Sequence, residues 1–303
     1  MESSQSHTTR NLIVAVALLA VAFVGCCSCA AATYAVSRLV ANVGTWDGSD
    51  LSGLRFGLPL HVLGRVTVER EFGETFEVGD GGHLVVDLAV GRVRIEGTDG
   101  EAVVVSGQVR ARGSDNADAR AKLDRVQVDL TQDGKTVRVE DTVDQPAGGW
   151  RNGSPEVLVT IQVPRNTSID LDVDVGDVRV EDTAADAAIH TDVARVVVAD
   201  VSPVEQLTIQ SDVGAIEFDG ALADGASYEF GSNVGAIEVR LPRQSRFELD
   251  ASSEIGAVIV DFEVDGEKPS LPVTRSVKGS VNGGGDTTVT ARSDIGAIAI
   301  RSH

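Results

Sequence analysis

The chain has 303 residues, with 46 acidic and 26 basic side chains, a formal net charge of −20 at pH 7 and only 4% aromatic residues. This excess of carboxylates argues against nucleic acid as a partner, because phosphate binding requires clustered Lys and Arg. It argues equally against docking on an anionic membrane surface. The apolar content of 42% is ample for a buried core and excludes a chain that is disordered for lack of hydrophobic residues.

An uncharged apolar segment lies close to the N-terminus. No charged residue occurs over 11–37, a stretch long enough to cross a hydrocarbon core of roughly 30 Å as one helix. We expect a single-pass membrane helix there, preceded by a short cytoplasmic tail (1–10) and followed by a flexible linker (38–60) and an extracytoplasmic domain. Two alternatives stay open: a cleaved signal peptide, and a lipoprotein signal in which Cys26 is the lipidated residue.

All three cysteines, Cys26, Cys27 and Cys29, belong to this apolar segment. The domain that follows therefore folds without disulfides or thiolate metal sites.

From residue 61 onward, alternating apolar and polar residues and turns rich in Gly, Asp and Asn indicate β-strands. One unit recurs: a β-branched residue, a glycine, any residue, a β-branched residue, any residue and an apolar residue. Its glycines are Gly91, Gly176, Gly214, Gly235, Gly256 and Gly296, and Ala194 takes the same place in a further copy. From position 176 the steps are 18, 20, 21, 21 and 40. A period near 20 residues predicts an all-β fold, a parallel β-solenoid with regular coils over 166–303.

The repeated glycine marks a change in the alternation of the strand. Before Gly235 the apolar positions are the even-numbered Tyr228, Phe230 and Val234, and after it they are odd-numbered from Ile237 onward. A strand alternates strictly, so this change requires an extra residue, as at a bulge or corner that glycine tolerates with φ > 0. If so, Gly235→Val destabilises the domain by roughly 1–3 kcal/mol. The residues expected to stack as inward-facing ladders are Val213, Val234 and Ile255, and Ile216, Ile237 and Val258.

The region 61–165 is less regular than the repeats. Residues 114–125 have the composition of a short helix with a Ser or Asp cap, and an Asp133-Gly134 turn beyond it predicts a hairpin.

Several segments together resemble the bacterial and archaeal putative-adhesin domain family of unknown function, which is related to the toast-rack β-solenoids. They are Val157–Val163 followed by Pro164, Ile169–Val178 with its central glycine, the recurrent Val-Gly-Ala-Ile units, and Val277–Gly285 before the last repeat. The resemblance covers about residues 61–303. It implies a solenoid in the cell envelope, often beyond one membrane helix, and it brings no catalytic residues.

The strongest candidate site is an acidic run after residue 169. Asp170, Asp172 and Asp174 project from one face of a strand, Asp177 follows the glycine, and Asp192 and Asp212 are expected on adjacent coils. Calcium prefers several converging carboxylates, so this run is a weak candidate for a calcium site. The alternative is a solvated outer face whose charges prevent aggregation of the sheet edges. No nucleophile elbow, phosphate loop or dinucleotide motif is present.

We therefore expect a non-enzymatic, membrane-anchored envelope protein whose exported acidic solenoid acts in adhesion or ligand binding, or as a structural surface. The expected partners are the membrane, through the N-terminal helix, an envelope glycan or protein, and a second copy stacking on an uncapped solenoid end. The expected cofactor is none, apart from calcium at the acidic run. A regulatory role toward a neighbouring membrane signalling system is the alternative function. A polysaccharide-active β-helix enzyme is a remote one.

Overall fold

The computed structural model describes residues 66–146, 154–266 and 275–303. The predictions for the tail (1–10), the membrane helix (11–37), the linker (38–60) and Cys26 lie outside these ranges. The described ranges all belong to one compact unit, His61–His303. In the described ranges no helix has the length and apolar character needed to cross a membrane.

The described chain is 69% strand and 4% helix, which confirms the all-β prediction. Its first elements are β1 (Val66–Glu77), β2 (His83–Thr98), β3 (Ala102–Gly113), α3 (Asn116–Leu123), β4 (Val126–Asp133), β5 (Thr136–Val143) and β6 (Glu156–Pro164). They are followed by β7 (Ser168–Glu181), β8 (Ala187–Ala199), β9 (Gln206–Asp219), β10 (Ser227–Val234), β11 (Ile237–Leu241), β12 (Phe247–Ile255), β13 (Val258–Val260), β14 (Val264–Gly266), β15 (Ser276–Val281), β16 (Thr288–Ile295) and β17 (Ile298–Ser302).

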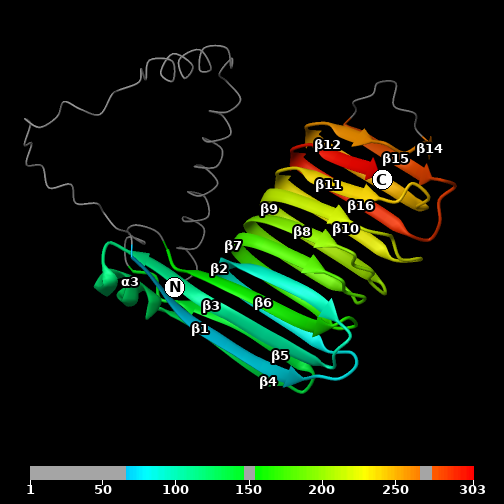
Figure 1. The fold of residues 1–303 in the computed structure, drawn as a ribbon. Coiled ribbons are helices and arrows are strands. Elements are labelled where there is room, and N and C mark those ends of the chain that lie inside the picture. The colour runs from blue at the N-terminus through cyan, green and yellow to red at the C-terminus, as the bar shows by residue number, and fades with distance from the viewer. Residues whose placement is uncertain (1–65, 147–153, 267–274) are drawn as a thin grey trace, which may run out of the picture. The chain divides into compact units, whose positions relative to one another are not determined.

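The regular part consists of bent strands lying side by side (Figure 1). β2, β7, β8 and β9 each continue through the bend, whereas β10–β11, β16–β17 and β12–β13 are interrupted there. We call the limbs before the bend the front layer and the limbs after it the back layer. The two layers face each other across the core. Phe218 of the back layer packs against Tyr228 and Phe230 of the front layer, with ring centroids 5.5 and 5.6 Å apart.

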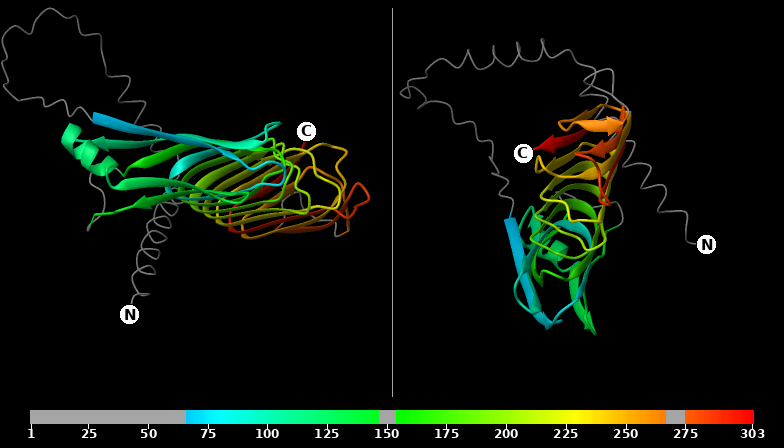
Figure 2. Two further views of the ribbon diagram at one scale, coloured as in Figure 1. Left: turned by 90° about the horizontal axis from the view of Figure 1, so that it is seen from below. Right: turned by 90° about the vertical axis from the view of Figure 1, so that its right-hand side faces the viewer.

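Neighbouring bent strands are parallel and in register, one beyond another in the views of Figure 2. Each repeat of about 20 residues therefore adds one bent strand to the stack, about 4.8 Å from its neighbour. Residues that share a place in the repeat form rows across the stack. The row just before the bend is Val90, Val175, Val193, Val213, Val234, Ile295 and Ile255.

The order of the stack departs from the order of the sequence near both ends. β16 and β17, the last strands of the chain, lie between β10–β11 and β12–β13. β2 likewise lies between β7 and the later strands β5 and β6. The expectation that Val234 stacks directly on Ile255 is therefore wrong, because Ile295 lies between them. The segment between β13 and β16 contains β14 and β15, and it allows the chain to come back so that β16 lies beside β12.

Antiparallel strands flank the stack at its ends, a point that the sequence left open. β15 pairs with β12 and β14, β3 pairs with β6 and β1, and β4 pairs with β5. Among the strands at the C-terminal end of the described stack, the short β13 and β14 are each paired on one side alone, β13 with β17 and β14 with β15. α3 lies within the range expected for a helix. Asp115 caps it by accepting a hydrogen bond from the backbone N–H of Asp118 at 2.9 Å.

Burial confirms the change of alternation at the bend but corrects which residues face inward. Tyr228 and Phe230 are buried before Gly235, and Ile237 and Val239 are buried after it. The last inward residue before the bend, however, is Ser232 and not Val234. The predicted inward ladder of Val213, Val234 and Ile255 is therefore wrong, and Ile255 is 63% exposed. The bend begins two residues before the glycine, so a small hydroxyl side chain fills the narrow interior and the β-branched residue lies outside.

The bend glycines are required by close approach of neighbouring backbones. A Cβ on Gly235 would overlap the carbonyl oxygen of Gly214, and one on Gly296 would overlap that of Gly235. The same overlap recurs along the stack at Gly176, Gly214 and Gly256. The φ angles at Gly214, Gly235 and Gly296 are 151°, 159° and 157°, a range that residues with side chains rarely adopt, which confirms the positive φ expected from the sequence at these three glycines. Close approach of a neighbouring carbonyl oxygen is the constraint that they share with Gly176 and Gly256.

We predict that Gly235→Ala lowers the free energy of unfolding by at least about 3 kcal/mol, because the added methyl group must displace a backbone carbonyl. Gly231→Ala in the same strand is the matched control, since its Cβ would meet Gln210 Cγ at an ordinary 3.6 Å. We expect that control to change stability by less than about 1 kcal/mol. Urea unfolding of both variants measures the difference, and equal midpoints would contradict the close-approach model.

Candidate functional site

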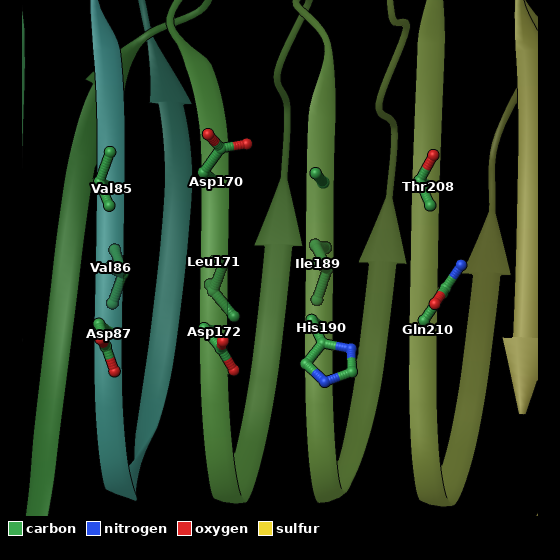
Figure 3. Close-up of a pocket in the computed structure, with 11 residues that line it drawn as sticks. Val85, Val86, Asp87, Asp170, Leu171, Asp172, Ile189, His190, Thr208 and Gln210 are labelled. Carbon is green, nitrogen blue, oxygen red and sulfur yellow. The ribbon is translucent and has the colours of Figure 1, made fainter. Parts of the chain in front are cut away.

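The outer face of the front layer carries the polar side chains of the acidic run. Because strands alternate, Asp170, Asp172 and Asp174 of β7 point outward while Leu171 and Val173 are buried. A shallow depression of about 520 Å³ lies over the first limbs of β2, β7, β8 and β9 (Figure 3). It is lined by Val85, Val86, Asp87, Asp170, Leu171, Asp172, Ala188, Ile189, His190, Thr208 and Gln210.

One row of this depression brings together residues far apart in the sequence. The strand register places Asp87 beside Asp172, Asp172 beside His190, and His190 beside Gln210 (Figure 3). Sequence reasoning missed Asp87, His190 and Gln210 as members of this site. The repeat period could have identified two of them, because residues 172, 190 and 210 are separated by 18 and 20 positions and therefore occupy the same place in successive repeats.

The other predicted site residues do not converge on this row. Asp170 lies at its border, with Oδ2 at 3.4 Å from His83 Nε2. Asp177 lies beyond the bend on the back layer, where its Oδ2 is 3.4 Å from Arg92 Nη2. The structure therefore separates Asp177 from Asp170, Asp172 and Asp174.

The neighbouring carboxylates expected to complete a cation site are engaged individually. Asp192 Oδ1 lies 3.9 Å from His190 Nε2, and Asp212 Oδ1 accepts a hydrogen bond from Asn233 Nδ2 at 2.9 Å. Among the residues the structure describes, no group of three or more His, Cys, Asp or Glu side chains is placed to hold a metal ion. Calcium binding by Asp170, Asp172, Asp174 and Asp177 stays a prediction.

Crowding of carboxylates changes their ionisation. Partial burial, followed by the negative charges of Asp192, Asp172 and Asp87, raises the pKa of Asp174 above its usual value of 3.8. Burial raises the pKa of Asp172 too, and the nearby imidazole of His190 offsets part of this rise. These two aspartates therefore hold their negative charge less readily than free aspartate does.

Asp141 of β5 adds a third carboxylate to the same neighbourhood. Its Oδ1 accepts a hydrogen bond from the backbone N–H of Ala89 at 2.9 Å, while its Oδ2 is buried with no hydrogen-bond partner. Burial, together with the charges of Asp87 and Asp174, raises the pKa of Asp141. The front layer thus concentrates unfavourable negative charge around Asp174.

A second depression, of about 230 Å³, continues the first along the stack. Gln210 lines both depressions. The residue beside it in the next strand is Gly231, and the surface is recessed there because glycine has no side chain. Arg292 of β16 follows in the same row. The front layer therefore presents a connected polar surface with carboxylate, imidazole, amide and guanidinium groups at regular spacing.

The back layer differs, because its charges form close ion pairs. Arg94 lies 3.0 Å from Glu181, and Arg195 lies 2.9 Å from Glu217. Such exposed pairs contribute little to stability, but they neutralise this face. The acidic character of the described chain is therefore most pronounced on the front layer.

Comparison with known proteins gives structural neighbours only. No protein-family model and no curated protein matches the chain. A putative cell adhesion protein from Clostridium sporogenes is 16% identical, with a TM-score of 0.45, and the alignment covers 78% of this chain and 100% of that one. A putative adhesin from Bacteroides fragilis is 14% identical, with a TM-score of 0.37 and coverage of 76% and 97%. A putative lipid binding protein from Parabacteroides distasonis is 10% identical, with a TM-score of 0.21 and coverage of 76% and 96%.

Proteins described as putative adhesins are thus among the structural neighbours. Their identities and TM-scores are too low to transfer a function or a site residue to this chain.

We predict that Asp174→Asn raises the free energy of unfolding at pH 7 by roughly 0.2–1 kcal/mol, because it removes like-charge repulsion across neighbouring strands. The raised pKa of Asp174 makes its ionisation unfavourable in the folded state. This penalty is absent below the pKa of the unfolded chain, where the wild-type carboxyl is protonated in both states. The gain should therefore shrink as the pH falls through the raised pKa toward 3.8.

Thermal melts at a series of pH values between 3 and 7 measure this effect. Asp224→Asn, in an exposed turn, is the control and should change stability by less than about 0.5 kcal/mol at each pH. A gain for Asp174→Asn that stays constant across the series would contradict the assignment.

Proposed function

We propose that the described domain is a parallel β-solenoid that acts as a non-enzymatic adhesion or ligand-binding module, with its front layer as the contact surface. The observation that carries this proposal is the connected polar row of Asp172, His190, Gln210 and Arg292, held in register by neighbouring strands. A rigid row with polar side chains at the same height on β7, β8, β9 and β16, and only Gly231 of β10 between them, is suited to an extended ligand that lies along the stack.

The chemistry of the row favours a hydroxyl-rich polymer such as an envelope glycan. Carboxylate, imidazole, amide and guanidinium groups donate and accept hydrogen bonds to hydroxyl groups. The described aromatic side chains of the regular repeats, such as Phe218, Tyr228 and Phe230, are buried in the core and are not available for stacking on sugar rings. The shallow depressions suit a polymer lying flat better than a small molecule, which generally requires an enclosed pocket.

We also propose that residues 11–37 anchor the chain in the membrane as a single-pass helix, with residues 61–303 outside the cytoplasm. The support is the uncharged length of this segment, which matches a bilayer core. The expected arrangement places the front layer where an extracellular ligand reaches it.

Binding of residues 61–303 to a glycan array and to whole cells tests the adhesion proposal. This range is one compact unit that contains the described core. We predict saturable binding that weakens about tenfold or more in the double variant His190→Ala/Gln210→Ala, because both side chains lie in the polar row. Arg240→Ala, on the opposite layer, is the matched control and should bind like the wild type.

The same assay with calcium and with a chelator tests the cation prediction. Loss of binding in chelator, reproduced by Asp172→Asn, would place a calcium ion at the acidic run. Equal binding in both conditions would remove calcium from the proposal. Absence of binding to every glycan and cell type would contradict the adhesion proposal and favour a structural role in the envelope.

Anchoring is tested by cell fractionation and by an alkaline phosphatase fusion after His303. We predict an active fusion in the membrane fraction, and Cys26→Ser should leave both the fraction and the apparent mass unchanged. Release of the Cys26→Ser protein, or loss of a palmitate label in it, would show lipoprotein processing instead of a retained helix.

A further inference from the structure

At the bend, hydroxyl side chains are buried and apolar side chains are exposed, which is the reverse of the usual distribution in a β-solenoid core. From β8 to β12 the inward row before the bend consists of the hydroxyl residues Thr191, Ser211, Ser232, Ser293 and Ser253, all at most 5% exposed, whereas β7 and β2 carry the buried Val173 and Leu88 in this row. Two residues later, a row of valine and isoleucine lies outside, and its members Val175 and Ile255 are 42% and 63% exposed. Places where a fold sets β-branched apolar residues outside and hydroxyls inside are expected to have a functional reason.

The outer row widens into a smooth apolar surface over β9 to β13. Each bent strand there contributes a β-branched residue, a glycine and an alanine. We name this surface the bend strip, and it consists of 213–215, 234–236, 295–297 and 255–257. Ala236 and Ala297 are exposed, and the glycines between add no side chain. Together with Val193 and Val175, the apolar row extends for roughly 24 Å at the spacing of a β-sheet.

Negative charge borders this strip along the front layer. The residues that directly precede the apolar row are Asp174, Asp192, Asp212, Asn233, Asp294 and Glu254. On the back-layer side the next outward residues include Glu217 and Glu238, but each is paired with an arginine at 2.9 Å, so the unbalanced negative charge lies on the front-layer side. The strip ends at β8, where Arg195 replaces the alanine and its guanidinium pairs with Glu217 at 2.9 Å. An apolar track bordered by carboxylates selects for a partner that is both apolar and basic.

We propose that the bend strip is a docking surface for a basic amphipathic segment of another polypeptide. Apolar side chains of that segment lie on the valine and isoleucine row, and its lysines or arginines face the bordering carboxylates. A helix of about 16 residues matches the 24 Å length of the row. This surface is distinct from the polar row of the front layer, so it does not depend on the proposed glycan contact.

A second copy of the chain is a poorer occupant. Two bend strips placed face to face would bring two rows of carboxylates together in a protein whose net charge is −20. Like charges placed across an interface cost several kcal/mol, whereas a basic partner would offset the repulsion among Asp174, Asp192 and Asp172.

Peptide binding to the full-length protein tests this proposal. The probe is a synthetic Leu/Lys amphipathic helix of about 20 residues, compared with a Leu/Glu helix of the same pattern and with an oligolysine of equal length. We expect the Leu/Lys peptide to bind at least tenfold more tightly than either comparison peptide. In Val213→Thr/Val234→Thr/Ile295→Thr its affinity should fall about tenfold or more, because the apolar contact is lost while the β-branched shape remains.

Two further variants distinguish a loss of peptide binding from a loss of folding. Val175→Thr/Ile255→Thr alters the two most exposed members of the row, so it should fold normally and still weaken the Leu/Lys peptide. Val197→Thr, on the outer face of the back layer, is the matched control and should leave the affinity unchanged.

Three outcomes would overturn the proposal. Equal affinities for oligolysine and the Leu/Lys peptide, insensitive to the threonine variants, would show attraction by charge alone. Equal binding of the Leu/Glu peptide would show a merely apolar surface. A dimer in sedimentation that dissociates in the Val175→Thr/Ile255→Thr variant would identify a second copy as the occupant.

Discussion

The close approach of backbones at the bends is the constraint on which the rest of the structure depends. Where Gly235 stacks on Gly214, a carbonyl oxygen occupies the place that a Cβ would need. This contact recurs at Gly176, Gly256 and Gly296, whereas Ala194 occupies the equivalent place in β8, and the bends of neighbouring strands stay in register. Register in turn decides which side chains share a height on the outer face, and therefore where the polar row and the bend strip lie.

The tight bend also explains the distribution of polarity. There is little interior volume near the turn, so Ser232 and its counterparts fit where larger residues would not, and the β-branched residue that follows is left outside. Ser253 shows how such a hydroxyl can be satisfied, because its Oγ donates a hydrogen bond to the carbonyl oxygen of Gly296 at 2.8 Å. One geometric feature thus places a row of small hydroxyl residues inside and leaves the following row outside, although it does not require that outer row to be apolar.

The two layers differ in how far their charges are neutralised by ion pairs. On the back layer, arginines and glutamates of neighbouring strands neutralise one another, as Arg94 and Glu181 do. On the front layer, Asp172, Asp174 and Asp141 are crowded, and the pKa of each is raised. Repulsion of this kind persists only where it is offset by the rest of the fold, and a bound cationic or hydrogen-bonding group would relieve it.

The sequence by itself determined the all-β class, the period near 20 residues, the change of alternation at the glycines and the place of a short helix, because these are local patterns of side-chain size and polarity. Tertiary structure alone decided that β16 and β17 insert between β11 and β12, since strand pairing between distant segments leaves no local pattern. It also separated Asp177 from Asp170 and joined His190 and Gln210 to Asp172. Which face a residue occupies near a bend depends on where the chain turns, and because the bend begins two residues before Gly235, Val234 lies outside although the alternation of the preceding strand predicts it inside.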